Sequence, residues 1–286
     1  MFENHMKFTD ADFKAFSDVI CKRYGICFND NKRELLQQKL LKIINRTEVN
    51  DFRELFDKIN KTRDHEFEKF FLDEITTHKT DYFREKEHFD YLNKNYRLLL
   101  DNNPDIAQNG EVRVWSSACS TGEEPYTLAM VLRETLPSSI NVRVLATDIS
   151  EKVLKQAQDG IYRSDIVNDT GKYYVQKYFI KQGDNYVVNE RLRDMVTFRR
   201  FNLMDDFRFR HDFHIIFCRN VMIYFDKDVQ SRLVKKFHEA LAPSGLFFIG
   251  LSETIPDKNI QFKTLQSSTF LKCKSPLLNI KPIDKS

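Results

Sequence analysis

The stretch from Val112 to Tyr126, VRVWSSACSTGEEPY, constrains the fold of this chain more than any other segment. Its first residues are apolar and predict a buried strand, Ser120-Thr121-Gly122 predicts a turn, and Glu123-Glu124-Pro125 opens a helix. Proline fits in the first helical turn, where its missing N–H has no cost. In an α/β sheet, such a turn lies at the carboxyl end of a strand, which is where ligands bind.

A second apolar segment, NVRVLATD, runs from Asn141 to Asp148 and ends on a carboxylate, and Ser150 is placed to cap a following helix. A strand, a turn, a helix and a strand ending in Asp form the nucleoside-binding half of a doubly wound fold, in which that acid accepts hydrogen bonds from ribose hydroxyls. The turn is not GxGxxG. With one glycine and two glutamates, it suits a positively charged ligand better than a pyrophosphate.

Length and composition narrow the class of protein. The 286 residues suggest two domains, and 41% hydrophobic residues, including 25 Phe, are sufficient for a packed core. Because 45 Lys and Arg face 42 Asp and Glu, the net charge is only +3 and bulk charge does not argue for a nucleic-acid partner.

The chain shows no membrane or secretory signal. No apolar run approaches the roughly 20 residues of a membrane helix, and the start MFENHMKF lacks secretory features, so we expect a cytoplasmic protein without membrane insertion. The cysteines are odd in number and show no CxxC spacing, which favours reduced thiols over a disulfide or a zinc site. They are Cys21, Cys27, Cys119, Cys218 and Cys273. We expect no metal site.

Helical periodicity dominates up to about residue 77. Thr9 and Asp12 form a capping-box pattern at the start of a helix that is expected to end near Gly25. Helices follow over 52–59 and around 67–75, and residues 86–101 form a further one. Between these, one helix is expected to carry on its inner side Leu35, Leu36, Leu40, Leu41 and Ile44. The pattern predicts a small helical bundle.

The remainder of the chain is expected to complete the sheet. The segment 102–110, NNPDIAQNG, is polar and turn-rich, which marks a boundary before the first strand. Further strands are expected over 195–202, 214–220 and 245–250, with a terminal hairpin within 262–274. The stretch 160–193 fits neither a clean helix nor a sheet strand and predicts a small inserted subdomain, with Tyr186-Val187-Val188 as one strand.

Four segments, read together, carry a family resemblance: THKTDYFRE at 77–85, STGEEPY at 120–126, ATDIS at 146–150 and FCRNVMIYF at 217–225. With GIYRSD at 160–165 and FNL at 201–203, the chain resembles the CheR family from about residue 8 to about residue 275. These are chemotaxis receptor methyltransferases, which use S-adenosylmethionine to methyl-esterify glutamate side chains. The resemblance implies a Rossmann-like class I methyltransferase domain of the α/β class, preceded by an all-α domain.

The resemblance also implies a domain layout and an activity. The expected layout is a helical domain over 1–80, a linker with a helix over 81–110, and a methyltransferase domain over 111–286 with a β-subdomain inserted at about 160–193. The expected reaction gives glutamyl methyl esters and S-adenosylhomocysteine. A substrate carboxylate is ionised at neutral pH, so transfer requires positioning and desolvation rather than a general base.

By motif position, the resemblance assigns the cofactor-binding residues. Glu124 would meet the positively charged methionyl end, Asp148 the ribose, Asn202 and Leu203 the adenine, and Cys218 and Arg219 the region beside the sulfonium, with Cys218 acting through its backbone. Chemistry alone does not separate Glu123 from Glu124, and family spacing favours Glu124. The linker contributes to the same cofactor site through His78, Thr80 and Arg84.

The expected catalytic residues are Arg84, which can hold the substrate carboxylate with its guanidinium, and Arg219 and Tyr224, which help to shape the pocket. Each of these residues also has a purely structural interpretation. Asp148 can cap a helix, the glutamates can interact favourably with the dipole of the helix that they begin, and Tyr224 can be a packing residue. His78 departs from the family, which usually has Asn there. If His78 contacts the cofactor carboxylate, its protonation would make cofactor affinity depend on pH. If it only replaces an amide hydrogen bond, cofactor affinity would not change.

The expected partner is the cytoplasmic domain of methyl-accepting chemoreceptors. Basic residues recur along the leucine-bearing helix and can form a stripe against an acidic receptor helix, although a solvated face is the commoner meaning of such charges. They are Arg33, Lys39, Lys42 and Arg46. The short stretch between Phe179 and Leu192 resembles members that do not bind a receptor C-terminal pentapeptide, so no tether is expected.

Two rival classes share the cofactor half. An amino-methylating enzyme usually shows an Asn/Asp-Pro-Pro-aromatic turn after the fourth strand, where this chain has CRNVMIYF. A catalytically silent cofactor-binding module would be expected to lose Arg84 or the strand-end acid, and this chain keeps both. The sequence therefore favours the protein-glutamate methyltransferase.

Overall fold

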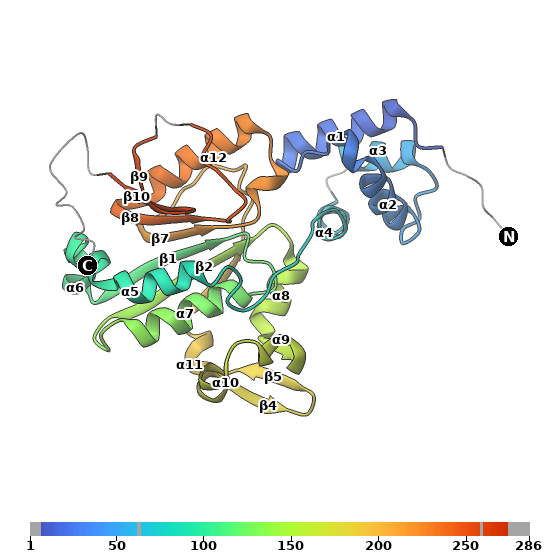
Figure 1. Cartoon of the computed structure of the whole chain (residues 1–286). Helices are drawn as coiled ribbons and strands as arrows, with labels where there is room; N and C mark the ends of the chain where they lie inside the picture. Colours follow the sequence, from blue (N-terminus) through green and yellow to red (C-terminus); the bar gives the residue numbers. More distant parts are fainter. Residues whose placement is uncertain (1–6, 62–63, 258–259, 274–286) are drawn as a thin grey trace.

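The N-terminal part of the computed structural model, which describes residues 7–61, 64–257 and 260–273, is helical (Figure 1). Its elements are α1 (Asp10–Tyr24), the 3₁₀ turn η1 (Asp30–Lys32), α2 (Arg33–Ile44), α3 (Phe52–Lys61) and α4 (His65–Ile75). Thr9 and Asp12 form the predicted capping box, and α1 ends at Gly25, which adopts the left-handed conformation. The helical bundle is confirmed.

Phenylalanine and leucine side chains fill the core of this bundle. Phe16, Ile20, Leu36 and Leu40 are almost completely buried in one cluster with residues of α3 and α4. Leu35 was expected inside and is 44% exposed, because it lies one position before Leu36 and therefore about 100° around the helix from the buried side. Its exposed face lines the cavity described below.

The second part is a seven-stranded sheet with the order β6-β2-β1-β7-β8-β10-β9. Its strands are β1 (Glu111–Ser117), β2 (Asn141–Asp148), β6 (Val196–Arg200), β7 (Phe213–Cys218), β8 (Leu241–Ile249), β9 (Phe262–Gln266) and β10 (Thr269–Lys272). The first five are parallel, and β10 is antiparallel to both β8 and β9. The order reverses at β1, which pairs with both β2 and β7, so ligands are expected at the carboxyl ends of these strands.

Helices cover both faces of the sheet. On one face lie α5 (Glu87–Asn102), α7 (Glu123–Thr135) and α8 (Glu151–Asp159), and on the other lies α12 (Lys227–Ala240), as Figure 1 shows. Alternate residues of β7 separate accordingly, since Ile215 and Phe217 join the α5 and α7 side while Ile216 and Cys218 join the α12 side. This three-layer arrangement is the predicted α/β fold.

Three details differ from the expected elements. The polar stretch after α5 contains a short helix of six residues, α6 (Pro104–Asn109), which begins with proline and ends at a left-handed glycine. Strand β8 begins at Leu241, four residues before the expected start at 245, and its ladder to β7 contains an irregularity there. Strand β7 ends at Cys218, which leaves Arg219 and Asn220 in the following loop. Lys274, at the end of the expected hairpin, lies outside the described residues.

The inserted subdomain forms a three-stranded antiparallel sheet with the order β3-β5-β4. Its elements are β3 (Ile161–Arg163), α9 (Ser164–Asn168), α10 (Lys172–Tyr178), β4 (Phe179–Gln182), β5 (Asn185–Val188) and α11 (Glu190–Arg193). The expected strand at Tyr186-Val187-Val188 is therefore confirmed. A two-residue turn at Gly183 and Asp184 joins β4 to β5, and the subdomain forms the lowest part of Figure 1.

The expectation that all cysteines are free thiols is wrong. Cys21 and Cys27 form a disulfide, with their Cα atoms 4.5 Å apart. The spacing of six residues gave no signal in the sequence, but the chain reverses at Gly25 and brings the two side chains together. Cys119, Cys218 and Cys273 are free. No helix within the described residues is long and apolar enough to cross a membrane.

Candidate active site

A cavity lies between the helical bundle and the carboxyl ends of the central strands. About 1280 Å³ of space lies among its lining residues, and part of this space is open solvent. Side chains from α1, α2, the linker after α4, and the loops after β1, β2, β6 and β7 line it. The cavity therefore occupies the topological switch point at which the sequence placed a ligand.

Asp148 ends β2 and lies at the wall of the cavity. Its two oxygens accept backbone N–H groups from Ser120 and Ser150, at 2.9 and 3.0 Å. Ser150, rather than Asp148, caps α8 by accepting from Val153. Burial raises the pKa of Asp148, and the backbone donor at Ser150 and the nearby His78 oppose this effect. Each oxygen keeps acceptor capacity for a further donor, as binding of ribose hydroxyls requires.

The structure separates the two neighbouring glutamates. Glu124 lines the cavity and accepts hydrogen bonds from Ser116 Oγ at 2.6 Å and from Arg219 Nη1 at 2.9 Å. Glu123 is buried away from the cavity, where Thr121 donates to it at 2.6 Å, and burial raises its pKa to about 7. Of the two neighbouring glutamates, Glu124 is therefore the one that can present its carboxylate to a ligand in this cavity.

Arg219 is buried between two carboxylates. It donates to Glu124 and, through Nε and Nη2, to Glu85 Oε2 at 3.2 and 3.0 Å, and it also donates to the Arg84 carbonyl. Burial raises the pKa of Glu124 despite the charge of Arg219. For Glu85, burial is outweighed by the hydrogen bond from Asn220 and the charge of Arg219, so its pKa is lowered. Arg219 thus shapes the site by holding the linker and the first turn of α7 together.

Glu253 fixes the loop that carries the FCRN motif and was not found from the sequence. Its carboxylate accepts three backbone N–H groups, from Asn220 at 3.0 Å, Ile223 at 3.2 Å and Gly250 at 2.6 Å. The side chain is buried, and burial raises its pKa. An acid 33 residues beyond the loop in sequence carries no local signal of this contact. Glu85 was missed for the same reason: it lies in the predicted 77–85 motif, but the sequence assigned it no role.

The linker residues predicted for the site lie along the cavity. His78, Thr80 and Arg84 all line it. His78 Nε2 lies 2.6 Å from Thr76 Oγ, its carbonyl accepts from Ser120 Oγ at 3.3 Å, and burial lowers the pKa of its imidazole. Arg84 donates to the Lys79 carbonyl at 2.7 Å and is half-buried. Its guanidinium therefore keeps donors that can face a substrate.

The remaining predicted residues divide into two groups. Asn202, Leu203 and Tyr224 line the cavity, and Asn202 also donates to the Arg23 carbonyl of α1 at 3.0 Å. Cys218 does not line it, because its side chain is fully buried on the α12 side of the sheet. Of the described residues, the one group close enough to hold a metal ion is Cys21, Cys27 and Asp226, and its two sulfurs are joined in the disulfide.

The basic residues of α2 are engaged within the helical bundle. Arg33 pairs with Asp10, and Lys39 donates to the carbonyls of Glu74 and Thr76 at 3.0 and 2.9 Å. Lys39 therefore does not belong to an exposed stripe, which corrects that part of the expectation. Lys42 and Arg46 are half exposed, and both pair with the buried carboxylate of Glu74.

Comparison with known proteins agrees with this site. The family model of the CheR methyltransferase SAM-binding domain matches residues 78–271, and that of the CheR methyltransferase all-alpha domain matches residues 11–76. A chemotaxis protein methyltransferase of Borreliella burgdorferi is 36% identical over 267 residues, covering 91% of this chain and 94% of that protein. The chemotaxis protein methyltransferase of Escherichia coli is 34% identical, covering 91% and 90%, and that of Salmonella typhimurium is 34% identical, covering 86% and 84%.

These matches extend over both the helical bundle and the sheet, so they cover the two sides of the cavity as well as the motifs that gave the resemblance. The chain belongs to the CheR methyltransferase family, and it is an enzyme with an S-adenosylmethionine-binding domain.

Proposed function

We propose that this protein transfers the methyl group of S-adenosylmethionine to glutamate carboxylates of chemoreceptors, giving glutamyl methyl esters and S-adenosylhomocysteine. The observation that carries the proposal is the joint lining of one cavity by Glu124, Asp148 and Arg84, in a chain whose relatives are named chemotaxis protein methyltransferases. The cofactor, when bound, supplies an electrophilic methyl group on a sulfonium.

The residues present fit such a cofactor. Asp148 offers two acceptor oxygens suited to vicinal hydroxyls, and Glu124 offers a carboxylate suited to an amino group. The backbone of Asn202 and Leu203 would offer donors and acceptors suited to an adenine edge, and His78 and Thr80 also line the cavity. The backbone at Cys218 and the side chain of Arg219 would border the region beside the sulfonium.

The chain's own part in the reaction is positioning. A glutamate carboxylate is ionised at neutral pH, so no general base is required. We assign to Arg84 the binding and orientation of the substrate carboxylate, which a guanidinium can hold through two hydrogen bonds. Tyr224 forms part of the cavity wall, and Arg219 fixes Glu124 and Glu85.

The test is transfer of a labelled methyl group from S-adenosylmethionine to receptor-containing membranes, followed by mild alkali. Label released as volatile methanol identifies a carboxyl methyl ester. We expect Arg84→Ala to abolish transfer and Arg97→Ala, a change at an exposed arginine of α5, to leave it intact. Alkali-stable label would instead indicate methylation of nitrogen or nucleic acid, and absence of label despite cofactor binding would indicate a silent module.

For receptor docking, we propose the exposed surface at the end of α2 and in the turn after it, where Lys42 and Arg46 lie. Charge reversal at these positions would also leave buried Glu74 without its partners. The sharper variant is Glu74→Gln, which frees both cations and raises the positive charge of this face by one unit. We expect a lower Michaelis constant for receptor and an unchanged cofactor affinity, and equal changes in both would contradict docking here.

We also propose that recruitment does not use a receptor C-terminal pentapeptide. The support is the short β4–β5 connection, in which only Gly183 and Asp184 separate the strands. Titration calorimetry with a receptor C-terminal peptide should show no binding at micromolar concentrations. Binding in that range would contradict the proposal and would direct attention to the open edges of β3 and β4.

A further inference from the structure

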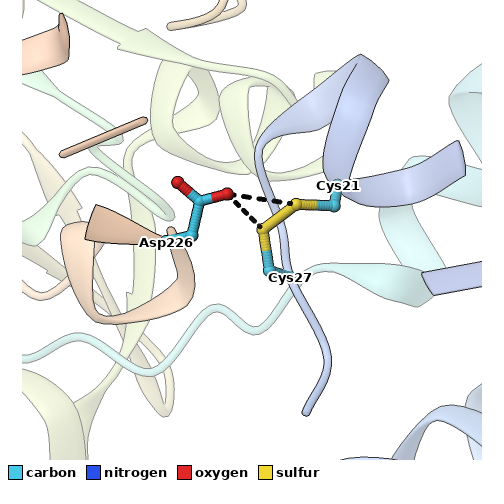
Figure 2. A group of neighbouring side chains, drawn as sticks. All are labelled: Cys21, Cys27 and Asp226. Atoms are coloured by element: carbon cyan, nitrogen blue, oxygen red, sulfur yellow. Dashed lines mark hydrogen bonds between the residues drawn. A yellow bond between two sulfur atoms is a disulfide. The ribbon is translucent and has the colours of Figure 1, made fainter. Parts of the chain in front are cut away.

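The disulfide between Cys21 and Cys27 lies where the helical bundle meets the part of the chain that forms the seven-stranded sheet, called here the catalytic half. Figure 2 shows it facing Asp226, which precedes α12. Both cysteines are partly accessible, whereas Cys119 and Cys218 are buried. A disulfide that bridges the end of a helix and an adjacent loop, rather than two elements of a core, is accessible to reductants and oxidants in solution.

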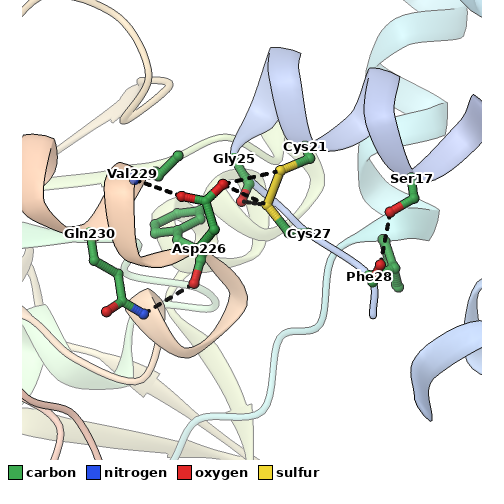
Figure 3. The surroundings of a disulfide bond; sticks show 9 residues. Ser17, Cys21, Gly25, Cys27, Phe28, Asp226, Val229 and Gln230 are labelled. Atoms are coloured by element: carbon green, nitrogen blue, oxygen red, sulfur yellow. Dashed lines mark hydrogen bonds between the residues drawn. A yellow bond between two sulfur atoms is a disulfide. The ribbon is translucent and has the colours of Figure 1, made fainter. Parts of the chain in front are cut away.

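The segment that the disulfide holds forms part of the cavity wall. Ile26, Cys27 and Phe28 line the cavity together with Tyr224. The Cys27 N–H donates to the Tyr224 carbonyl at 2.8 Å. Figure 3 shows the second contact, in which Ser17 Oγ donates to the Phe28 carbonyl at 2.8 Å. The position of this short segment therefore affects both the cavity and a loop that carries a predicted site residue.

Gly25 makes the junction tight. Its φ of +75° lies in the left-handed region, and a Cβ atom there would lie 2.8 Å from Phe225 and 2.9 Å from Met204. The chain thus turns directly against the catalytic half. The disulfide closes the short ring from Cys21 to Cys27 around this turn, which limits the conformations open to the residues between them.

Asp226 provides an electrostatic influence on the two sulfurs. Its Oδ2 lies 3.8 Å from each of them, while its Oδ1 accepts from the Val229 N–H at 2.7 Å and caps α12 (Figure 3). Disulfide sulfurs carry no hydrogen, so these contacts become hydrogen bonds only in the dithiol, whose S–H groups can donate to the carboxylate. The negative charge also disfavours a thiolate beside it, which slows oxidation of the dithiol.

We propose that Cys21 and Cys27 are a reversible redox pair that tunes cofactor affinity, with a peroxide as the oxidant. One thiolate attacks hydrogen peroxide, the O–O bond breaks, and hydroxide leaves to give a sulfenic acid. The second thiolate then attacks that sulfur and displaces hydroxide, so two thiols and one peroxide yield the disulfide and two waters. A small-molecule dithiol reverses the bond and is itself oxidised to its disulfide.

The disulfide form is expected to bind cofactor more tightly, because it holds the segment 26–28 in the cavity wall before the ligand arrives. Reduction frees this segment, so part of its ordering then accompanies binding. We expect a difference of about fivefold in the dissociation constant, the lower end of typical coupling between sites. This coupling rests on the proposed cofactor cavity, whereas formation of the bond does not.

The experiment uses the whole protein in buffer with a chelator, after treatment with either dithiothreitol or one equivalent of hydrogen peroxide. Non-reducing peptide mapping measures the linkage of Cys21 to Cys27, and titration calorimetry measures binding of S-adenosylhomocysteine. We expect the linked peptide only after peroxide, together with an about fivefold lower dissociation constant. The double variant Cys21→Ser/Cys27→Ser should bind like reduced protein in both conditions.

Three outcomes would overturn the proposal: no linked peptide, equal affinity in the two states, or the same redox response in the double variant. Binding in neither state, with the linked peptide present, would refute the cofactor cavity and the coupling together. Asp226→Asn tests the electrostatic role separately, because asparagine still caps a helix. We expect it to form the disulfide at least about twofold faster at neutral pH, and an unchanged rate would contradict the role of the carboxylate.

Discussion

Replacement of Arg219 by methionine should cost more stability at neutral pH than at acidic pH. The arginine is the only cation that bonds both Glu85 and Glu124 within the described residues, and the two acids are 15% and 13% exposed in their side chains. Removing one partner of a buried ion pair typically costs about 3–5 kcal/mol. In this variant Glu124 still accepts a hydrogen bond from Ser116, and Glu85 still accepts from Asn220 and from the Leu251 N–H. We therefore expect the free energy of unfolding to decrease by about 3 kcal/mol.

The pH dependence follows from the sign of the pKa changes. In the wild type, the pKa of Glu85 is lowered, so its contribution to stability is present above its unfolded pKa and disappears as the pH falls through the folded value. Without Arg219, burial raises the pKa of both acids above their unfolded values. The folded variant then binds more protons than the unfolded chain, so its stability deficit shrinks as the pH falls.

Urea unfolding at pH 7.5 and pH 5 measures both effects. Arg219→Met/Glu85→Gln is the matched control, because glutamine removes one stranded charge and keeps an acceptor for Asn220. We expect this double variant to recover at least about 1 kcal/mol at pH 7.5. A deficit of Arg219→Met below about 1 kcal/mol, or one that is equal at both pH values, would refute the assignment of this network as a buried charge cluster.

Three further predictions concern single positions. Glu253→Ala should lower the free energy of unfolding in urea by about 3 kcal/mol, because three backbone N–H groups lose their acceptor, and Glu253→Gln should lose less. Gly25→Ala should lower it by at least about 1 kcal/mol, since the new Cβ meets Phe225 and Met204, and thermal unfolding should show this loss. Burial lowers the pKa of His78, so just below the ordinary histidine pKa the unfolded chain binds more protons than the folded chain. The free energy of unfolding in urea should therefore decrease as the pH is lowered through that range, and it should decrease less in His78→Asn. An equal decrease in the two proteins would contradict this.

Local patterns in the sequence predicted the parts of the fold that local physics determines. The cap at Thr9, the helix end at Gly25 and the strand that ends at Asp148 each depend on a few neighbouring residues, and all three were expected. Leu35 was misplaced because helical periodicity does not state which arc of α2 faces the bundle. The disulfide was missed because its formation depends on a chain reversal rather than on cysteine spacing.

In the candidate site, too, residues within local motifs were predicted, whereas contacts between distant parts of the chain were not. The motifs predicted that Glu124 and Asp148 come together, since parallel strands deliver their carboxyl ends to one edge of a sheet. They did not predict the groups that hold those motifs in place. Glu85 meets Arg219 across 134 residues of chain, and Glu253 meets Ile223 across 30.

In the sequence, an acid that will be buried cannot be distinguished from an exposed one, and its partner is determined by the tertiary structure. Glu124 illustrates the consequence, because Arg219 already holds one of its oxygens. In the proposed function, an amino group of the cofactor at Glu124 would share that carboxylate with Arg219, and through Arg219 it would act on Glu85 and on the linker that carries Arg84. We therefore propose that one buried guanidinium joins cofactor binding to substrate positioning.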